Sequence, residues 1–198
     1  PIMAHGIAAM SMGFLTSERT PTVWRGPMAS GALVQMLEQT LWGDLDILLI
    51  DMPPGTGDIQ LTLSQRATLN GAVIVTTPQD IALLDARKGI EMFNKVNVPI
   101  LGLVENMAVH ICTQCGHQEP IFGVEGGQRL ASEYHVPVLA SLPLSLLTRE
   151  NADAGQPLVV SAPASNEAAL FLGAADQLIA ALSAQKVATG PTITLGDD

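Results

Sequence analysis

The sequence predicts an α/β domain built on a doubly wound, mainly parallel sheet. Short apolar runs without a helical period recur along the chain, and several are bounded by Gly, Pro, Asn or Asp. Most of these runs alternate with longer stretches in which apolar residues return every three or four positions. Strands that alternate with helices in this way form parallel sheets whose two faces are covered by the helices.

The composition is that of a folded, acidic protein. Hydrophobic residues make up 47% of the 198 residues and charged residues 14%, which is not the balance of a disordered chain. Nine Lys and Arg stand against nineteen Asp and Glu, a formal net charge of −10, so neither nucleic acid nor a membrane is expected as a partner. The sequence has no basic signal-peptide region and no apolar run near the roughly 20 residues of a membrane span. We therefore expect a cytoplasmic protein.

We assign strands and helices from hydrophobic period and turn chemistry. Strands are expected over the short apolar segments 10–15, 46–51, 71–76, 99–104 and 136–142. Helices are expected over the periodic segments 30–41, 60–68, 81–94, 125–135, 146–153 and 166–182. The residues beyond Ser183 include no core candidates, so we expect one domain over 1–183 and a loose tail over 184–198.

Caps and apolar faces define two of these helices further. Ser30 is a suitable N-cap, because its hydroxyl can accept a hydrogen bond from a free N–H of the first turn. Leu41 falls on the apolar face of the same helix. In the helix over 81–94, one stripe holds Ile81, Leu84, Lys88 and Met92.

The stretch Asp46-Ile-Leu-Leu-Ile-Asp-Met-Pro-Pro-Gly-Thr-Gly-Asp58 organises the rest of the chain. Its apolar strand ends in Asp51, and open α/β sheets bind ligands at the carboxyl ends of their strands. Gly55 and Gly57 then allow backbone shapes and close approach that other residues resist. An aspartate followed by glycines, whose backbone no side chain covers, suits a site for a hydrated Mg²⁺ and a terminal phosphate. The alternative is an aspartate that only ends the strand and caps the next turn.

The segment His110-Ile-Cys-Thr-Gln-Cys-Gly-His117 carries both cysteines of the chain. Cys112 and Cys115 are spaced as in a metal knuckle, where the turn lets two thiolates converge on one ion. A thioredoxin-like pair would open a helix after the first strand of its fold, whereas this pair lies in a loop far along the chain. A third possibility is a zinc site completed by His110 or His117, although such histidines are more often plain loop residues.

Several segments together resemble the Mrp/NBP35 family of deviant P-loop ATPases, which carry iron–sulfur clusters. Ile50-Asp-Met-Pro-Pro-Gly-Thr-Gly-Asp-Ile-Gln-Leu-Thr-Leu-Ser-Gln65 is similar to the family's switch II segment. Other segments fall where the family has them: Trp24-Arg-Gly-Pro-Met28, Thr76-Thr-Pro-Gln79, Glu105-Asn-Met107 and the Cys112/Cys115 pair. The resemblance covers roughly residues 1 to 183 and implies the SIMIBI fold of the MinD/ParA type.

The resemblance implies a nucleotide site at the ends of the strands. Asp51 would hold Mg²⁺ through water, and Gly55 and Gly57 would let the switch loop sense the γ-phosphate of ATP. Asn106 would hydrogen-bond the adenine base, because an amide offers both a donor and an acceptor. Its alternative role is to close its own turn.

Two further nucleotide features follow from the same resemblance. The backbone around Pro143 and Leu144 would line the adenine pocket. The printed sequence contains no Gly-x-x-x-x-Gly-Lys-Ser/Thr loop, since none of its three lysines follows a glycine. The resemblance therefore implies that the first strand–loop–helix lies upstream of Pro1. We expect this chain alone to hydrolyse ATP to ADP and phosphate weakly or not at all.

The cysteine pair supplies half of the four thiolates that a 4Fe–4S cluster usually takes. A two-fold axis would place the same loop of two chains face to face and complete the site. The resemblance implies such a homodimer, which holds a labile cluster and transfers it to apo iron–sulfur proteins. Zinc in place of the cluster remains open. So do a MinD/ParA-like, ATP-controlled regulator that binds partners and a small zinc-stabilised domain without activity.

The sequence allows two roles for each of four charged residues. Arg25 either reaches a phosphate or the opposing subunit, or is solvated. Asp58 either takes part in catalysis or caps the next helix, and the cap is the simpler role. Asp85 and Lys88 lie three positions apart, where opposite charges pair on a helix surface, and the resemblance also puts this region near the dimer face.

Overall fold

A three-stranded parallel sheet forms the centre of the protein, in a computed structural model that describes residues 1–15, 26–52 and 57–185. The strands, in spatial order, are β3 (Ala72–Thr76), β4 (Ile100–Glu105) and β7 (Val138–Ser141). Their register pairs Thr76 with Glu105 and Glu105 with Ser141, so all three strands end at one edge of the sheet. The predicted strands at 71–76, 99–104 and 136–142 are confirmed.

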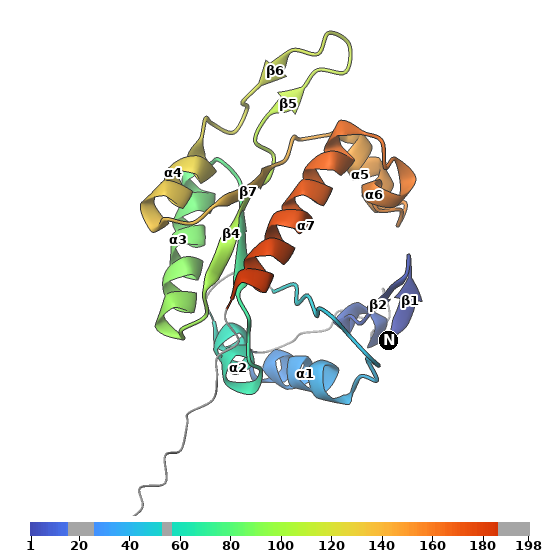
Figure 1. Ribbon diagram of the computed structural model, residues 1–198, viewed down its shortest axis with the longest axis vertical. Helices are drawn as coiled ribbons and strands as arrows, with labels where there is room; N and C mark the ends of the chain where they lie inside the picture. Colours follow the sequence, from blue (N-terminus) through green and yellow to red (C-terminus); the bar gives the residue numbers. More distant parts are fainter. Residues whose placement is uncertain (16–25, 53–56, 186–198) are drawn as a thin grey trace, which may run out of the picture.

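Helices lie on both sides of this sheet (Figure 1). They are α1 (Gly26–Gln39), α2 (Asp58–Arg66), α3 (Asp80–Lys95), α4 (Gly126–Tyr134), α5 (Leu146–Asp153), α6 (Leu158–Ser161) and α7 (Asn166–Ala184). In Figure 1, α3 and α4 cover one face and α7 lies on the other side, packed against β7 and β4. The doubly wound α/β class is confirmed, although α6 is a helix that the sequence did not predict.

The main core lies between the sheet and the pair α3 and α4. Ile90, Leu103 and Leu130 are its largest fully buried side chains, one each from α3, β4 and α4. Each brings an aliphatic side chain out of water, which stabilises the fold by about 1.5–3 kcal/mol per residue. This packing fixes the two helices against the strands whose ends form the candidate site.

The buried face of α3 differs from the predicted stripe. Ile81 is 72% exposed and Leu84 is also exposed. The buried residues are Leu83, Ala86, Ile90 and Met92, so Met92 is the one member of the predicted stripe that is buried. Because α3 carries two overlapping apolar stripes, its spacing alone does not choose between them. The helix turns the stripe that contains the small Ala86 toward the sheet.

The first helix begins earlier than predicted. It starts at Gly26, so Ser30 lies inside it and is not its N-cap. The Ser30 hydroxyl is buried and has no hydrogen-bond partner among the described residues. The helix ends at Gln39, which leaves Leu41 outside it and 88% exposed. The prediction that Leu41 belongs to a buried helical face was wrong.

The N-terminal residues form a hairpin and a turn of 3-10 helix where we expected a strand. β1 (Ile2–Ala4) pairs antiparallel with β2 (Ile7–Ala9). The connecting His5 and Gly6 both have positive φ angles, of 50° and 81°, which suits the tight two-residue turns of hairpins. Met12–Leu15 is the 3-10 turn, so the strand predicted at 10–15 was wrong.

The apolar segment 46–51, predicted as a central strand, pairs with no strand in the described chain. A groove of about 1150 Å³ separates it from β3, and both line that groove. Sheet strands lie about 4.7–4.9 Å apart, so a segment on the far side of such a groove has no ladder partner. Its apolar side chains stay in water, with Leu49 79% exposed.

Helix α7 is the one described helix long and apolar enough, by length and composition alone, to cross a membrane. Core helices of soluble proteins meet the same criterion. α7 packs on β7, where the Gln177 amide Nε2 donates to the Leu139 carbonyl at 3.1 Å. The tail was predicted over 184–198, but Ala184 is the last residue of α7, and residues 186–198 lie outside the described residues.

Candidate functional site

The carboxyl edge of the sheet brings three predicted site residues into one region. The Asn106 N–H donates to the Thr76 carbonyl at 2.7 Å, and the Leu142 N–H donates to the Glu105 carbonyl at 2.8 Å. These bonds extend the β3–β4 and β4–β7 pairings beyond the strands. They hold Asn106 beside the segment that continues into Pro143 and Leu144.

Asn106 closes its own turn. Its Oδ1 accepts a hydrogen bond from the Met107 N–H at 3.0 Å, and Met107 has a positive φ of 56°. The Asn106 amide nitrogen makes no hydrogen bond with the described part of the chain. The turn role is thus seen directly, and two N–H donors of the same side chain are left for a ligand.

Pro143 and Leu144 line a different hollow from Asn106. They border a pocket of about 300 Å³ together with Ile111 and the start of α7. Asn106 instead lines the larger groove beside β3. The structure brings the three predicted adenine-contacting residues to one edge of the sheet, but it does not bring them into one pocket.

The predicted phosphate-side residues lie at or near the larger groove. Asp51 is exposed and lines this groove. Gly57 precedes α2 with a φ of −89°, a value open to any residue, so its backbone does not require glycine. Asp58 is the first residue of α2 rather than its cap. Gly55 and Arg25 lie outside the described residues.

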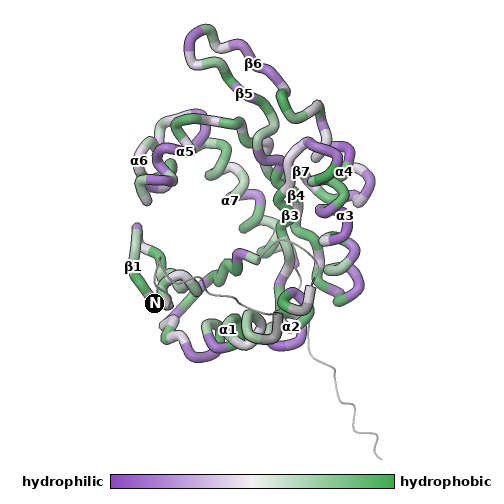
Figure 2. Tube along the Cα trace, turned by 180° about the vertical axis from the view of Figure 1, so that it is seen from behind, coloured by the Kyte–Doolittle hydropathy of each residue, from purple (hydrophilic) through white to green (hydrophobic). Residues whose placement is uncertain are grey.

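Both cysteines lie in the turn of a small hairpin that projects from the sheet (Figures 1 and 2). Its strands are β5 (His110–Ile111) and β6 (Gln118–Glu119), paired antiparallel. The Cys112 N–H donates to the His117 carbonyl at 2.9 Å, and the Gly116 N–H donates to the Cys112 carbonyl at 2.9 Å. Gly116 has a φ of +71°, which a residue with a side chain rarely adopts. These two backbone hydrogen bonds close a tight turn over residues 112–117.

The turn favours the thiolate of Cys112. Backbone N–H groups of Cys115 and Gln114, together with the Cys115 thiol, lower the pKa of Cys112 by hydrogen bonding to its sulfur. Cys115 is exposed, and Cys112 is partly exposed. The thiolate is the form of cysteine that ligates a metal or a cluster, and an exposed sulfur is accessible to one.

No third ligand joins this pair among the described residues. They contain no group of three or more His, Cys, Asp or Glu side chains that could hold a metal ion together. His110 and His117, considered above as zinc ligands, therefore do not assemble a four-ligand site with the two cysteines in this arrangement. A tetrahedral site at this turn needs ligands from elsewhere.

Asp85 and Lys88 form the surface pair that their spacing predicted. The Lys88 Nζ lies 3.1 Å from the Asp85 Oδ1, and both side chains are more than half exposed. Such pairs contribute little to stability.

The sequence analysis assigned no role to Glu105 beyond its place in the Glu105-Asn-Met107 motif. A carboxylate that ends a buried strand is nevertheless a signal of a buried polar contact.

The chain matches the model of one protein family along most of its length. The family is ParA, described as NUBPL iron-transfer P-loop NTPase, and the match spans residues 1–179.

Curated relatives give the same picture. The chain is 64% identical over 171 residues to the iron-sulfur cluster carrier protein of Pseudomonas fragi, covering 86% of this chain and 60% of that protein. It is 58% identical over 182 residues to the protein of that name from Escherichia coli K12, covering 92% and 49%. It is 54% identical over 179 residues to mouse iron-sulfur cluster transfer protein NUBPL, covering 90% and 56%. The chain thus spans about half the length of these relatives.

Two solved structures are similar in fold. One is the nucleotide-binding protein from Archaeoglobus fulgidus in complex with ADP, with a TM-score of 0.58 and 38% identity, covering 65% of this chain and 53% of that one. The other is the cell division ATPase MinD of Pyrococcus furiosus, with a TM-score of 0.57 and 25% identity, covering 76% and 58%.

Proposed function

This chain belongs to the NUBPL iron-transfer P-loop NTPase family, and we propose that it forms part of an ATP-dependent carrier that binds an iron–sulfur cluster and passes it to apo iron–sulfur proteins. The observation that carries the proposal is the Cys112/Cys115 turn. Both cysteines lie between the strands of the projecting β5–β6 hairpin, and backbone N–H groups lower the pKa of Cys112 there. The names of the relatives point to the same cargo.

The exposure of the pair suits a carrier rather than a structural metal site. Transfer of a cluster is ligand exchange, in which the thiolates of a recipient replace those of the carrier one by one. This exchange needs sulfurs that a recipient can reach, and it needs no acid–base pair. A closed four-ligand site would hold its metal against such exchange.

Two cysteines leave a cluster half ligated, so we propose that two copies of the chain share one. The proposed cargo is a 4Fe–4S cluster, which takes four thiolates. A two-fold axis through the tips of two hairpins would supply them from a single Cys-x-x-Cys per chain. The projection of the hairpin away from the body favours this arrangement, because two tips can approach before the bodies collide.

We propose ATP with Mg²⁺ as the nucleotide of the whole protein. Asn106 offers free amide donors to a base, and the neighbouring Pro143 and Leu144 offer apolar surface. Asp51 presents an exposed carboxylate, the ligand type that hydrated Mg²⁺ prefers. Bound Mg²⁺ would neutralise phosphate charge there. The solved relative bound to ADP supports a nucleotide in this fold.

The test is anaerobic reconstitution with iron and sulfide, followed by absorbance, metal analysis and sizing. We would use the 198-residue chain, the full-length protein, and the variants Cys112→Ser and Cys115→Ser. The expected result is about one four-iron cluster per two chains, lost in both variants. His110→Ala and His117→Ala are the matched controls, and they should bind the cluster as the wild type does.

A second candidate is a MinD/ParA-like regulator whose ATP state controls partner binding. The likeness to a solved MinD favours it, although the cysteine turn has no evident task in such a protein. Tightly held zinc without iron uptake, or cluster binding indifferent to either cysteine, would replace the carrier by this candidate.

A further inference from the structure

Glu105 is a buried carboxylate with defined partners. It ends β4 and is 5% exposed. Its Oε1 accepts a hydrogen bond from the Gly127 N–H at 2.7 Å, inside the first turn of α4. Its Oε2 lies 3.4 Å from the Ser141 hydroxyl on β7. A carboxylate bound to a free N–H of a first helical turn makes one of the stronger hydrogen bonds in proteins.

This contact closes the loop that carries the cysteines. Glu105 and Gly127 are 22 positions apart, and the whole β5–β6 hairpin lies between them. One end of the loop leaves β4 directly after Glu105, while the other end returns to the Glu105 side chain. Glu105 therefore links the start of the segment that presents Cys112 and Cys115 to its end.

The chain at Gly126 and Gly127 is built for this close approach. A Cβ on Gly127 would lie 2.9 Å from the Glu105 Cβ, and a Cβ on Gly126 would lie 2.6 Å from the Pro78 carbonyl oxygen. Real side chains do not fit at such distances, so the first turn of α4 needs both glycines. The preceding Glu125 has a positive φ of 53°, which turns the returning chain into the helix.

The other side of the hairpin base is hydrogen-bonded to the segment that follows β7. The Ala108 N–H donates to the Leu142 carbonyl at 2.9 Å, and the Leu144 N–H donates to the Val109 carbonyl at 2.8 Å. Beyond these bonds the hairpin has strands of two residues each, too short to fix its own position. The position of the cysteines is thus set at the base of the loop.

We propose that Glu105 is a positioning residue that holds the base of the cysteine loop and thereby places the two thiolates relative to the edge of the sheet. This deepens the proposed carrier function, on which its consequence for the cluster rests. When the carboxylate is lost, the Gly127 N–H loses its acceptor and one end of the loop is released. The thiolates then meet a shared cluster in many orientations, and the cluster is lost faster.

The experiment uses the full-length protein with Glu105→Ala, Glu105→Gln and, as matched control, Glu133→Ala. Glu133 is a glutamate of α4 that contacts α3 and lies outside the loop base. Amide hydrogen exchange over residues 108–125 is measured without any cluster. We expect about tenfold faster exchange there in Glu105→Ala, the effect of losing one hydrogen bond. Glu105→Gln keeps an acceptor and should stay close to the wild type.

The second readout is the rate at which a reconstituted cluster is lost to a chelator. It should rise by about the same factor in Glu105→Ala, and Glu105→Gln should restore it. If Glu105→Ala does not fold, Glu105→Asp replaces it, because the shorter side chain keeps the charge but retracts the oxygens. Unchanged exchange over 108–125 would overturn the proposal, and so would an equal rise across β3 and α3. If the wild type takes up no cluster, the carrier function fails while the exchange data still decide the role of Glu105.

Discussion

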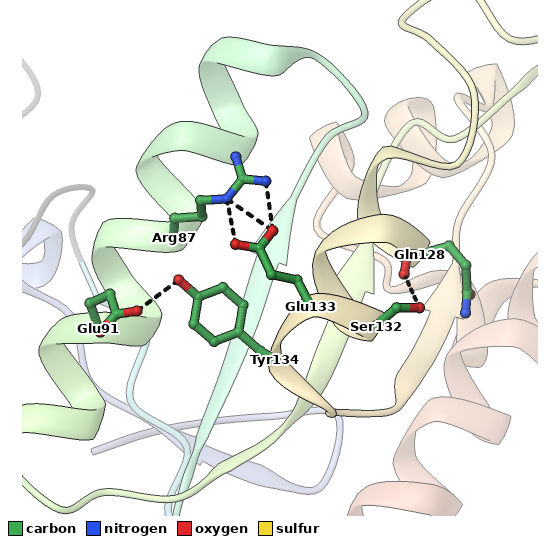
Figure 3. A network of polar contacts seen from close by, with 6 residues as sticks. All are labelled: Arg87, Glu91, Gln128, Ser132, Glu133 and Tyr134. Carbon is green, nitrogen blue, oxygen red and sulfur yellow. Dashed lines mark hydrogen bonds and ion pairs between the residues drawn. The ribbon is translucent and has the colours of Figure 1, made fainter.

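Arg87 on α3 and Glu133 on α4 form a two-pronged ion pair (Figure 3). The Arg87 Nη2 lies 2.8 Å from the Glu133 Oε2, and the Arg87 Nε lies 3.2 Å from both carboxylate oxygens. On the next turn of α3, Glu91 accepts a hydrogen bond from the Tyr134 hydroxyl at 2.8 Å. Two polar contacts thus join the helices that cover one face of the sheet.

The ion pair should make stability depend on pH at the acid end. Arg87 holds the pKa of Glu133 below its ordinary value, chiefly by hydrogen bonding to the carboxylate. A carboxyl group with a lowered folded-state pKa stabilises the fold above its unfolded pKa, and this contribution is lost as pH falls through the folded pKa. We expect Glu133→Gln to be less stable than the wild type at pH 7 and to converge with it as pH falls through the lowered pKa of Glu133.

Urea midpoints of both proteins between pH 3 and pH 7 would check this. The pair is exposed, so the gap should be small and should narrow further in 1 M salt. A gap that stays constant down to pH 3 would show that lost packing, rather than lost charge, separates the two proteins.

Tyr134 is the one tyrosine of the chain, so its ionisation can be read directly by absorbance at alkaline pH. Desolvation raises its pKa above the ordinary value of 10.0, and the hydrogen bond to Glu91 raises it further. We expect Glu91→Gln to lower the titration midpoint while leaving it above 10.0, because desolvation is the larger cause. An unchanged midpoint would mean that the bond to Glu91 does not persist in solution. Lys88→Ala, three positions away on α3, is a suitable control.

The sequence correctly predicted the strands of the central sheet, each of which pairs with another strand of the described chain. β3, β4 and β7 pair with one another, so their apolar runs and their structure agree. The run at 46–51 has an equally apolar sequence but lies across a groove from β3. Hydrophobic period shows that a segment suits a strand, whereas only a partner at ladder distance makes it one.

The sequence also predicted part of the candidate site. The spacing of Cys112 and Cys115 identified the turn, and the position of Asn106 after a strand placed it at the sheet edge. The place of Glu105 at the end of a buried strand signals a buried polar contact, but no local pattern identifies Gly127, 22 positions away, as its partner. The predicted start of α1 was wrong for a different reason. Ser30 has the side-chain chemistry of an N-cap, but the helix begins four residues earlier, at Gly26.

Ser165 caps the start of α7 with a shorter hydrogen bond than Ser145 makes at the start of α5. The Ser165 Oγ accepts a hydrogen bond from the Ala168 N–H at 3.1 Å at the start of α7, whereas the Ser145 Oγ lies 3.4 Å from the Thr148 N–H at the start of α5. We expect Ser165→Ala to cost about 1 kcal/mol and Ser165→Asn to cost much less, because asparagine also caps. Chemical denaturation measures both, and an equal loss in the two variants would contradict the role of the cap.

The cysteine turn should make the Cys112 thiol more acidic in solution. Because N–H groups and the Cys115 thiol lower the pKa of Cys112 from its ordinary value of 9.0, its thiolate should appear at lower pH than in an unstructured peptide. In Cys115→Ser, where Cys112 is the one remaining cysteine, the rate of alkylation by iodoacetamide should rise with pH to a midpoint below 9.0. Denaturation in urea removes the turn and should return the midpoint to the ordinary value. If the folded and denatured chains gave the same midpoint, the turn would not favour the thiolate, and the carrier proposal would rest on the exposure of the pair and on the family.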